Sequence, residues 1–185
     1  MSPKSVTDRI DAFSTEAELL AQARRGSPSA IGILYEAHGG LLLRLAMRIT
    51  GSAADAEDLL HDLFIGLPEL LSRYEHRSRL DAWLRAVITR MAIARLRQGA
   101  RREQLASARH PEPERQAVGD PWGAVDLDRA LAQLSNTTRA VFVLRQVEGY
   151  SHAEIAVLLG ISSGASRVRH LRALQQLRAL LEPKS

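Results

Sequence analysis

Three arginines near the C-terminal end of the chain, Arg167, Arg169 and Arg172, have the spacing of a nucleic-acid-binding helix. They stand in a stretch that has no acidic residue between Glu154 and Glu182. Guanidinium groups pair with DNA phosphates and form bidentate hydrogen bonds with guanine, so such a helix can hold and read DNA. The alternative interpretation is an ordinary helical hairpin with an arginine-rich face in solvent.

The residues that precede these arginines predict how they are positioned. Ser151 and Glu154 form a capping-box pattern that begins a short helix. Gly160 stands where the following turn needs a positive φ, and Ser162 or Ser163 can cap the next helix. The order of helix, glycine turn and basic helix predicts a helix-turn-helix, whose second helix lies in the DNA major groove.

A second group of residues is acidic and suits a basic partner. Asp58 and Asp62 are four residues apart, so they share one helix face, which also presents His61. Leu59 and Phe64 on the same segment can anchor either the fold or a contact. A plain solvated acidic face is the alternative interpretation.

A third segment, from Arg73 to Arg102, is rich in arginine and has only two acids, Glu75 and Asp81. A predicted loop and helix carry these cations, which cannot all face one side, so some serve only solubility. Trp83 falls on the apolar stripe of the helix and is predicted to belong to the core and not to a base-stacking platform. The candidate contacts with a polyanion in this segment are Arg73, Arg77, Arg79, Arg85, Arg90, Arg95 and Arg97.

Composition excludes several classes of protein. The chain has 185 residues, a formal net charge of +4 and no cysteine, so disulfides and thiolate metal sites are excluded and a reducing cytoplasm is expected. The N-terminus lacks the apolar stretch of a signal peptide, and direct membrane insertion is not expected. The histidines lack metal-ligand spacing, and no nucleophile–base pattern or phosphate-binding glycine loop occurs. We therefore expect no enzyme activity, no cofactor, no metal and no small-molecule substrate.

The periodicity of apolar residues predicts an all-α chain with two small helical domains. The first domain is expected at residues 15–102, with four helices. Prolines and turn residues predict a flexible linker at 103–122. The second domain, at 123–182, contains the helix-turn-helix.

Three motifs in this order resemble the extracytoplasmic-function (ECF) branch of bacterial sigma factors. They are Ala56-Glu-Asp-Leu-Leu-His-Asp-Leu-Phe64, then Leu80-Asp-Ala-Trp-Leu84 with the arginine-rich helix, and Leu134-Ser-Asn-Thr-Thr-Arg139 through the helix-turn-helix. The resemblance covers about residues 21–181. It implies that the first domain is sigma region two and the second is sigma region four.

The resemblance also implies partners and roles for the candidate residues. Core RNA polymerase would bind Asp58, Leu59, His61, Asp62 and Phe64, and the arginines of the third segment would contact and melt the minus-ten element of promoter DNA. An anti-sigma factor is a further expected partner. The minus-thirty-five element would be contacted by Ser163, Ser166, Arg167, Arg169, His170 and Arg172.

Departures from the family pattern affect promoter preference. Arg90 and Ala94 stand where the family often has asparagine and aspartate, and His170 stands where an aliphatic residue is usual. Ala165-Ser166 replaces a common threonine–valine pair, so Ser166 is expected to be half-buried. We therefore do not assign the family's usual preference for minus-ten sequences to this chain.

Three other functions stay open from the sequence. The first is a helix-turn-helix regulator that works without polymerase, which would not need the acidic helix around Asp58. The second is a sigma-like module that sequesters an anti-sigma protein, which would not need the arginine-rich helix. A helical-bundle enzyme is the third.

Overall fold

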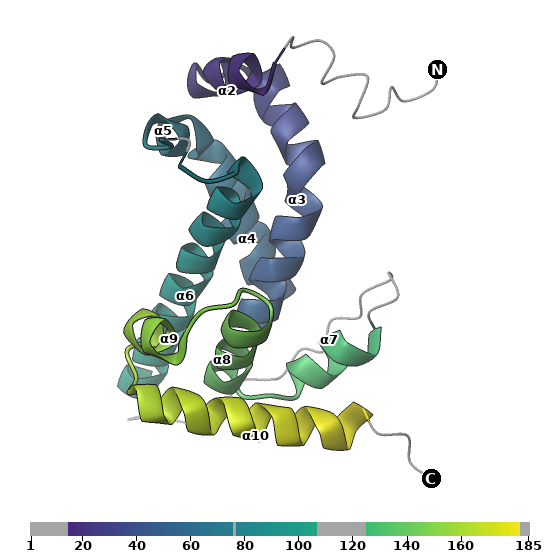
Figure 1. Ribbon diagram of the computed structural model, residues 1–185, viewed down its shortest axis with the longest axis vertical. Helices are drawn as coiled ribbons and strands as arrows, with labels where there is room; N and C mark the ends of the chain where they lie inside the picture. Colours follow the sequence, from purple (N-terminus) through teal and green to yellow (C-terminus); the bar gives the residue numbers. More distant parts are fainter. Residues whose placement is uncertain (1–14, 76, 107–124, 182–185) are drawn as a thin grey trace.

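The computed structural model describes residues 15–75, 77–106 and 125–181, and all regular structure in these ranges is α-helical (Figure 1). The all-α prediction is confirmed for this part of the chain. The predicted linker lies mostly outside the described residues, except that residues 103–106 continue the preceding helix. The first-domain helices are α2 (Glu16–Arg24), α3 (Pro28–Thr50), α4 (Ala53–Ile65), α5 (Leu67–Ser72) and α6 (Leu80–Ala106); the second-domain helices are α7 (Val125–Ala132), α8 (Asn136–Gln146), α9 (His152–Leu159) and α10 (Ser163–Leu181).

The long helix α3 organises the first domain by packing against α4 and α6. It ends at Gly51, whose φ of 71° is left-handed, and Ser52 then caps α4 by accepting a hydrogen bond from the amide of Asp55. By length and composition α3 could cross a membrane, but a core helix passes the same test, and Leu42, Ile49 and other apolar residues of α3 are buried among its neighbours.

The described part of the first domain has five helices where four were expected, because the segment around Pro68 is divided between two helices. Helix α4 ends at Ile65, and Gly66 separates it from the short helix α5, in which Pro68 occupies the first turn. The amides of the first turn need no partner within the helix, so proline fits there without loss of a hydrogen bond. The resulting corner brings α5 beside α2 at one end of the molecule (Figure 1).

The helix-turn-helix forms as predicted. Ser151 and Glu154 make both hydrogen bonds of the capping box at the start of α9. Gly160 adopts a φ of 67° after α9, and the side chain of Ser162 accepts a hydrogen bond from the amide of Ala165 in the first turn of α10. Helix α10 then crosses the base of the second domain against α8, α9 and α7 (Figure 1).

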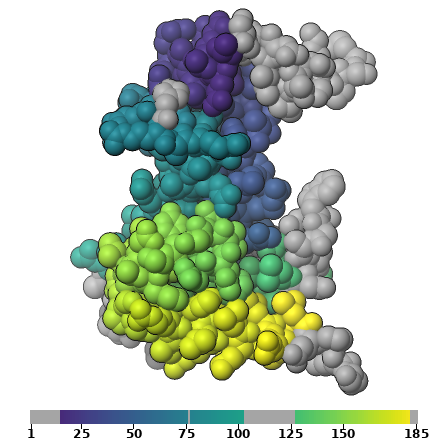
Figure 2. All heavy atoms as spheres, viewed as in Figure 1, coloured from purple at the N-terminus to yellow at the C-terminus, as the bar shows by residue number. Residues whose placement is uncertain are grey.

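The two domains pack directly against each other (Figure 2). Helix α8 lies beside the C-terminal part of α3, and α9 lies beside α6. Ile93 of α6 belongs to the same buried cluster as Val141, Leu144 and Ile155 of the second domain. The hydrophobic core is therefore continuous across both predicted domains.

Candidate polymerase and nucleic-acid interfaces

Helix α4 presents the acidic face that its sequence predicts. Asp58, His61 and Asp62 are exposed, whereas Leu59 and Phe64 are 4% and 7% exposed. The two apolar side chains therefore fix α4 in the fold, and the charged residues form the surface that a partner can reach.

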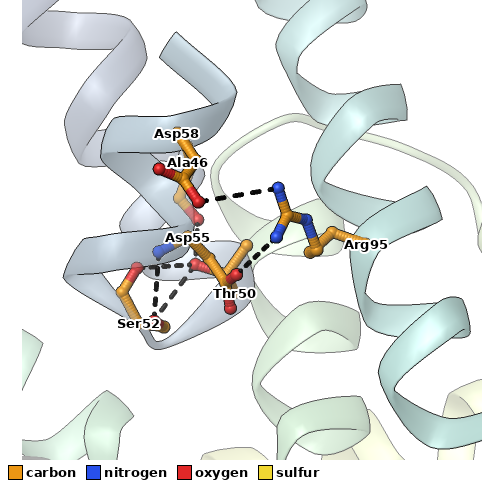
Figure 3. Close-up of polar contacts among 6 residues, drawn as sticks. All are labelled: Ala46, Thr50, Ser52, Asp55, Asp58 and Arg95. Atoms are coloured by element: carbon orange, nitrogen blue, oxygen red, sulfur yellow. Dashed lines mark hydrogen bonds and ion pairs between the residues drawn. The ribbon is translucent and has the colours of Figure 1, made fainter. Parts of the chain in front are cut away.

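One arginine of the third segment faces this acidic helix. Arg95 on α6 lies with its Nη1 3.0 Å from a carboxylate oxygen of Asp55 and its Nη2 3.9 Å from one of Asp58 (Figure 3). All three side chains are partly exposed, so the pairs contribute little to folding and can be broken at low cost. Arg95 joins α6 to α4 in this structure, and its predicted contact with DNA would require these pairs to break.

The arginines just before α6 are highly accessible. Arg73, Arg77 and Arg79 are highly exposed and each pairs with an acid close in sequence, at N–O distances of 2.9, 2.7 and 3.2 Å respectively. Pairs this exposed are worth at most about 1 kcal/mol, so a polyanion can replace the acids. The partners are Glu69, Glu75 and Asp81.

Further along α6 the predicted DNA contacts lie near the second domain. Arg85 forms a bidentate ion pair with Glu148, which stands between α8 and α9. Arg90 is exposed and lines a groove with Tyr150 and Val157. Arg97 is also exposed and lies close to Gly160 in the turn of the helix-turn-helix.

Helix α10 presents two of its three predicted arginines freely. Arg167 and Arg172 are exposed, and Arg169 is half-buried with its Nη1 3.4 Å from the carbonyl oxygen of Ala165. Ser163 begins the helix and is half-buried. The arrangement suits a helix that holds DNA through its guanidinium groups.

Two residues of the predicted minus-thirty-five set point inward. Ser166 is 0% exposed, more buried than expected, and shares a 2.9 Å hydrogen bond with Nδ1 of His152. His170 is half-buried, with its ring 5.5 Å from that of His152 and 6.3 Å from that of Phe142. Ser166 therefore positions α10 from inside the domain, and its buried hydroxyl does not face a surface that DNA could reach.

The two histidines of this cluster have lowered pKa values. Burial and the nearby guanidinium groups of Arg145 and Arg167 lower the pKa of His152. Burial, His152 and Arg145 lower the pKa of His170. Both rings are consequently held in the neutral form at the junction of α8, α9 and α10.

Sequence reasoning missed a group of residues that join the two domains. Arg48 of α3 is paired with Asp128 of α7 at 2.8 Å, in addition to the Arg85–Glu148 pair. Arg139 of α8 is 4% exposed and donates to the carbonyl oxygens of Thr50 at the end of α3 and of Leu134. The sequence signal for this contact was the position of Arg139, four residues before Val143 and therefore on the buried face of α8. A cation at a position where the helical pattern expects an apolar residue indicates an interface.

Among the described residues, no carboxylate is paired with the buried guanidinium of Arg139. Its third partner is the side-chain oxygen of Asn136, and within the described ranges its Nε has no hydrogen-bond partner. Burial lowers the pKa of Arg139 to about 10, which still leaves the guanidinium charged at neutral pH. The negative end of the α3 dipole partly compensates this charge.

Comparison with known families agrees with this geometry. Residues 34–102 match the sigma-70 region 2 family and residues 124–177 match the sigma-70 region 4 family. An acidic helix, an arginine-rich helix and a helix-turn-helix in this order thus define a sigma-70-type transcription factor.

Individual relatives narrow the assignment. The chain is 34% identical to the RNA polymerase sigma factor CarQ of Myxococcus xanthus over 85% of this chain and 92% of CarQ. It is 35% identical to the ECF RNA polymerase sigma factor SigL of Mycobacterium tuberculosis, over 80% of this chain and 87% of SigL. It is 33% identical to the ECF RNA polymerase sigma factor SigE of Mycolicibacterium smegmatis, over 82% of this chain but only 62% of SigE. The chain belongs to the ECF family of RNA polymerase sigma factors.

A solved structure supports the fold. The sigma factor RpoE of Bartonella quintana, determined in complex with the anti-sigma factor NepR, superposes with a TM-score of 0.53 at 24% identity. The match covers 79% of this chain and 92% of RpoE.

Proposed function

We propose that this chain is an alternative sigma factor that binds core RNA polymerase and directs it to promoters, acting by binding alone and in the cytoplasm. The observation that carries the proposal is the separation of charge between elements. An exposed acidic face lies on α4, whereas exposed arginines lie before α6 and along α10. One protein can then hold a basic protein partner and a polyanion at the same time.

The acidic face of α4 is the proposed polymerase contact. Asp58 and Asp62 are exposed on a helix that Leu59 and Phe64 fix rigidly from beneath. Opposite charge on the partner would steer the encounter and fix its orientation. Asp58 is already 3.9 Å from Arg95, so binding of a basic partner would compete with that intramolecular pair.

The arginines divide between two promoter elements. Arg73, Arg77 and Arg79 are highly exposed cations of the proposed minus-ten region, and their weak local ion pairs leave them available for phosphates. Arg167 and Arg172 on α10 are proposed to contact the minus-thirty-five element.

An anti-sigma factor is the proposed regulator. A protein that covered the α4 face and part of the second domain would compete with polymerase directly. Binding at one of these places would raise the effective concentration at the other, so one inhibitor could use both.

Charge reversal on α4 tests the proposal. The double variant Asp58→Arg with Asp62→Arg should lose co-purification with core RNA polymerase and run-off transcription from a genomic fragment library, with unchanged circular dichroism. The matched control is Glu16→Arg with Glu36→Arg, which reverses two exposed acids on α2 and α3 and should keep both activities. Retained binding by the α4 variant would refute this interface. Sequence-specific DNA binding by a wild-type chain that never associates with polymerase would support a polymerase-independent regulator.

A further inference from the structure

We propose that Val168 and Leu171 on α10 recognise thymine methyl groups in the minus-thirty-five element and thereby select the base pairs that this chain's promoters carry there. The inference rests on the proposed function, in which α10 enters the major groove of promoter DNA. It adds to the arginine contacts a source of base selection that carries no charge.

The exposed face of α10 is one continuous stripe along the first half of the helix, which lies at the outer edge of the second domain (Figure 2). Most of its members follow one another at intervals of three or four residues, which places them on one side of a helix. They are Gly164, Arg167, Val168, Leu171, Arg172 and Gln175. Ser166, Ala173 and Leu177 are buried on the other side. The stripe is therefore the part of α10 that a DNA groove would receive.

Two apolar side chains stand in the middle of this stripe. Val168 is 48% exposed and Leu171 is 59% exposed, and both lie outside the buried core clusters. Arg167 and Arg172 flank them, and the stripe carries no acid. An apolar protein partner would not need the flanking guanidinium groups. DNA offers phosphates to the arginines and, in the major groove, the apolar C5 methyl group of thymine. Charge and apolar surface together match DNA that contains thymine.

The spacing of the apolar pair suits neighbouring base pairs. Side chains three residues apart on a helix have Cβ atoms about 5–6 Å apart, and successive base pairs are about 3.4 Å apart. Two methyl groups on neighbouring or next-neighbouring base pairs can therefore contact the pair. At Gly164 an added Cβ would meet only the side chain of Ser162, at 3.9 Å, so internal packing does not require glycine there. Its lack of a side chain lets the first turn of α10 approach the bases closely.

Removal of single methyl groups tests the proposal. Promoters are first selected from a genomic fragment library with the holoenzyme that this chain forms with core RNA polymerase. Each thymine of the minus-thirty-five region is then replaced in turn by deoxyuridine, which lacks only the C5 methyl group. The affinity of the holoenzyme for each labelled duplex is measured.

The protein variants are Val168→Ala and Leu171→Ala, which shorten exposed side chains and should leave circular dichroism unchanged. The control is Leu180→Ala, which shortens an exposed leucine on the same helix. Leu180 is nine positions from Leu171 and therefore lies on the other side of α10.

We expect thymine at one or two fixed positions of the selected promoters. Deoxyuridine at these positions should weaken binding of the wild-type holoenzyme about fourfold, because a methyl group loses its apolar contact. Val168→Ala and Leu171→Ala should each weaken binding to the thymine duplex and remove the effect of deoxyuridine at one position. Leu180→Ala should keep the wild-type affinity and the full effect of deoxyuridine.

The outcomes separate this inference from the proposed function. A chain that forms no holoenzyme, or a holoenzyme that selects no promoter, refutes the proposed function and the inference with it. Promoter binding without a deoxyuridine-sensitive position refutes methyl recognition alone. A sensitivity that both alanine variants retain also refutes it and assigns the preference to DNA shape. Loss of polymerase association in either alanine variant would overturn the inference by assigning the apolar pair to a protein contact.

Discussion

At the scale of single residues, Gly51 combines a left-handed backbone conformation with close contact to the guanidinium of Arg139. Its φ of 71° ends α3, and a Cβ added there would overlap the guanidinium of Arg139. The glycine therefore permits two things at once: the left-handed turn and the approach of the second domain to the end of α3.

Gly51→Ala should reduce the free energy of unfolding by more than the left-handed conformation alone explains. The conformation costs about 1 kcal/mol for alanine, and displacement of Arg139 should add at least a similar amount. Gly26→Ala is the control, because Gly26 has a φ of 78° and open space around its Cβ position. Equal losses in chemical denaturation would contradict a role for Gly51 in domain docking.

At the scale of elements, helix α10 combines exposed arginines with a buried hydrogen bond. Ser166 and His152 fix how α10 crosses α9, so the direction of Arg167 and Arg172 depends on a buried contact. Substitutions on the exposed face of α10 should therefore remove guanidinium groups directly, whereas substitutions on its buried face should change the direction of the helix.

Arg167→Ala and Arg172→Ala should each weaken binding to the chain's promoter. An arginine that reads a base should cost about 1–3 kcal/mol at one position, whereas a phosphate contact should weaken all sequences equally. Arg25→Ala removes the same charge from the end of α2 and should leave promoter affinity nearly unchanged. Unchanged promoter output in both α10 variants would mean that this helix does not read the minus-thirty-five element.

The His152–His170 pair should make the second domain sensitive to acid. Both pKa values are lowered in the folded state, so the unfolded chain binds protons more readily below its histidine pKa of about 6.5. The stability that depends on neutral rings is complete above that pH and is lost as the pH falls below it. The charged groups that face the pair, Arg145 from α8 and Arg167 from α10, are both cationic and oppose protonation.

Thermal unfolding at pH 7.5 and 5.5 tests this prediction. The wild-type melting temperature should fall at the lower pH, and His152→Gln with His170→Gln should reduce that fall, because glutamine cannot take up the proton. The exposed His61 provides the control, and His61→Gln should keep the wild-type pH dependence. An unchanged pH dependence in the double variant would exclude the pair as its source.

At the scale of the whole molecule, the continuous core predicts that the domains unfold together. Ile93 of the first domain packs with Val141, Leu144 and Ile155, so loss of one domain exposes apolar surface of the other. Calorimetry of the free chain should show one transition, whereas Asp128→Asn with Glu148→Gln should separate it into two. Two transitions in the wild-type chain would mean that docking contributes little to stability.

The sequence by itself determined several of the helix ends and the order of the motifs. Gly51, Gly160 and the Ser151–Glu154 capping box end or begin helices through contacts within a few residues, which a local pattern specifies. The family resemblance was equally readable, because the acidic helix and the helix-turn-helix are each one continuous segment. The exposed state of Asp58 and Asp62 also followed from helical spacing.

Only the tertiary structure decided which of these charges meet. Arg85 and Glu148 are 63 residues apart, and the burial of Arg139 depends on the packing of α8 against the end of α3. Ser166 is fully buried because His152 of another helix accompanies it, which local periodicity does not specify. Local backbone and capping energies set each helix, whereas the desolvation of charges between domains depends on long-range packing that no short pattern contains.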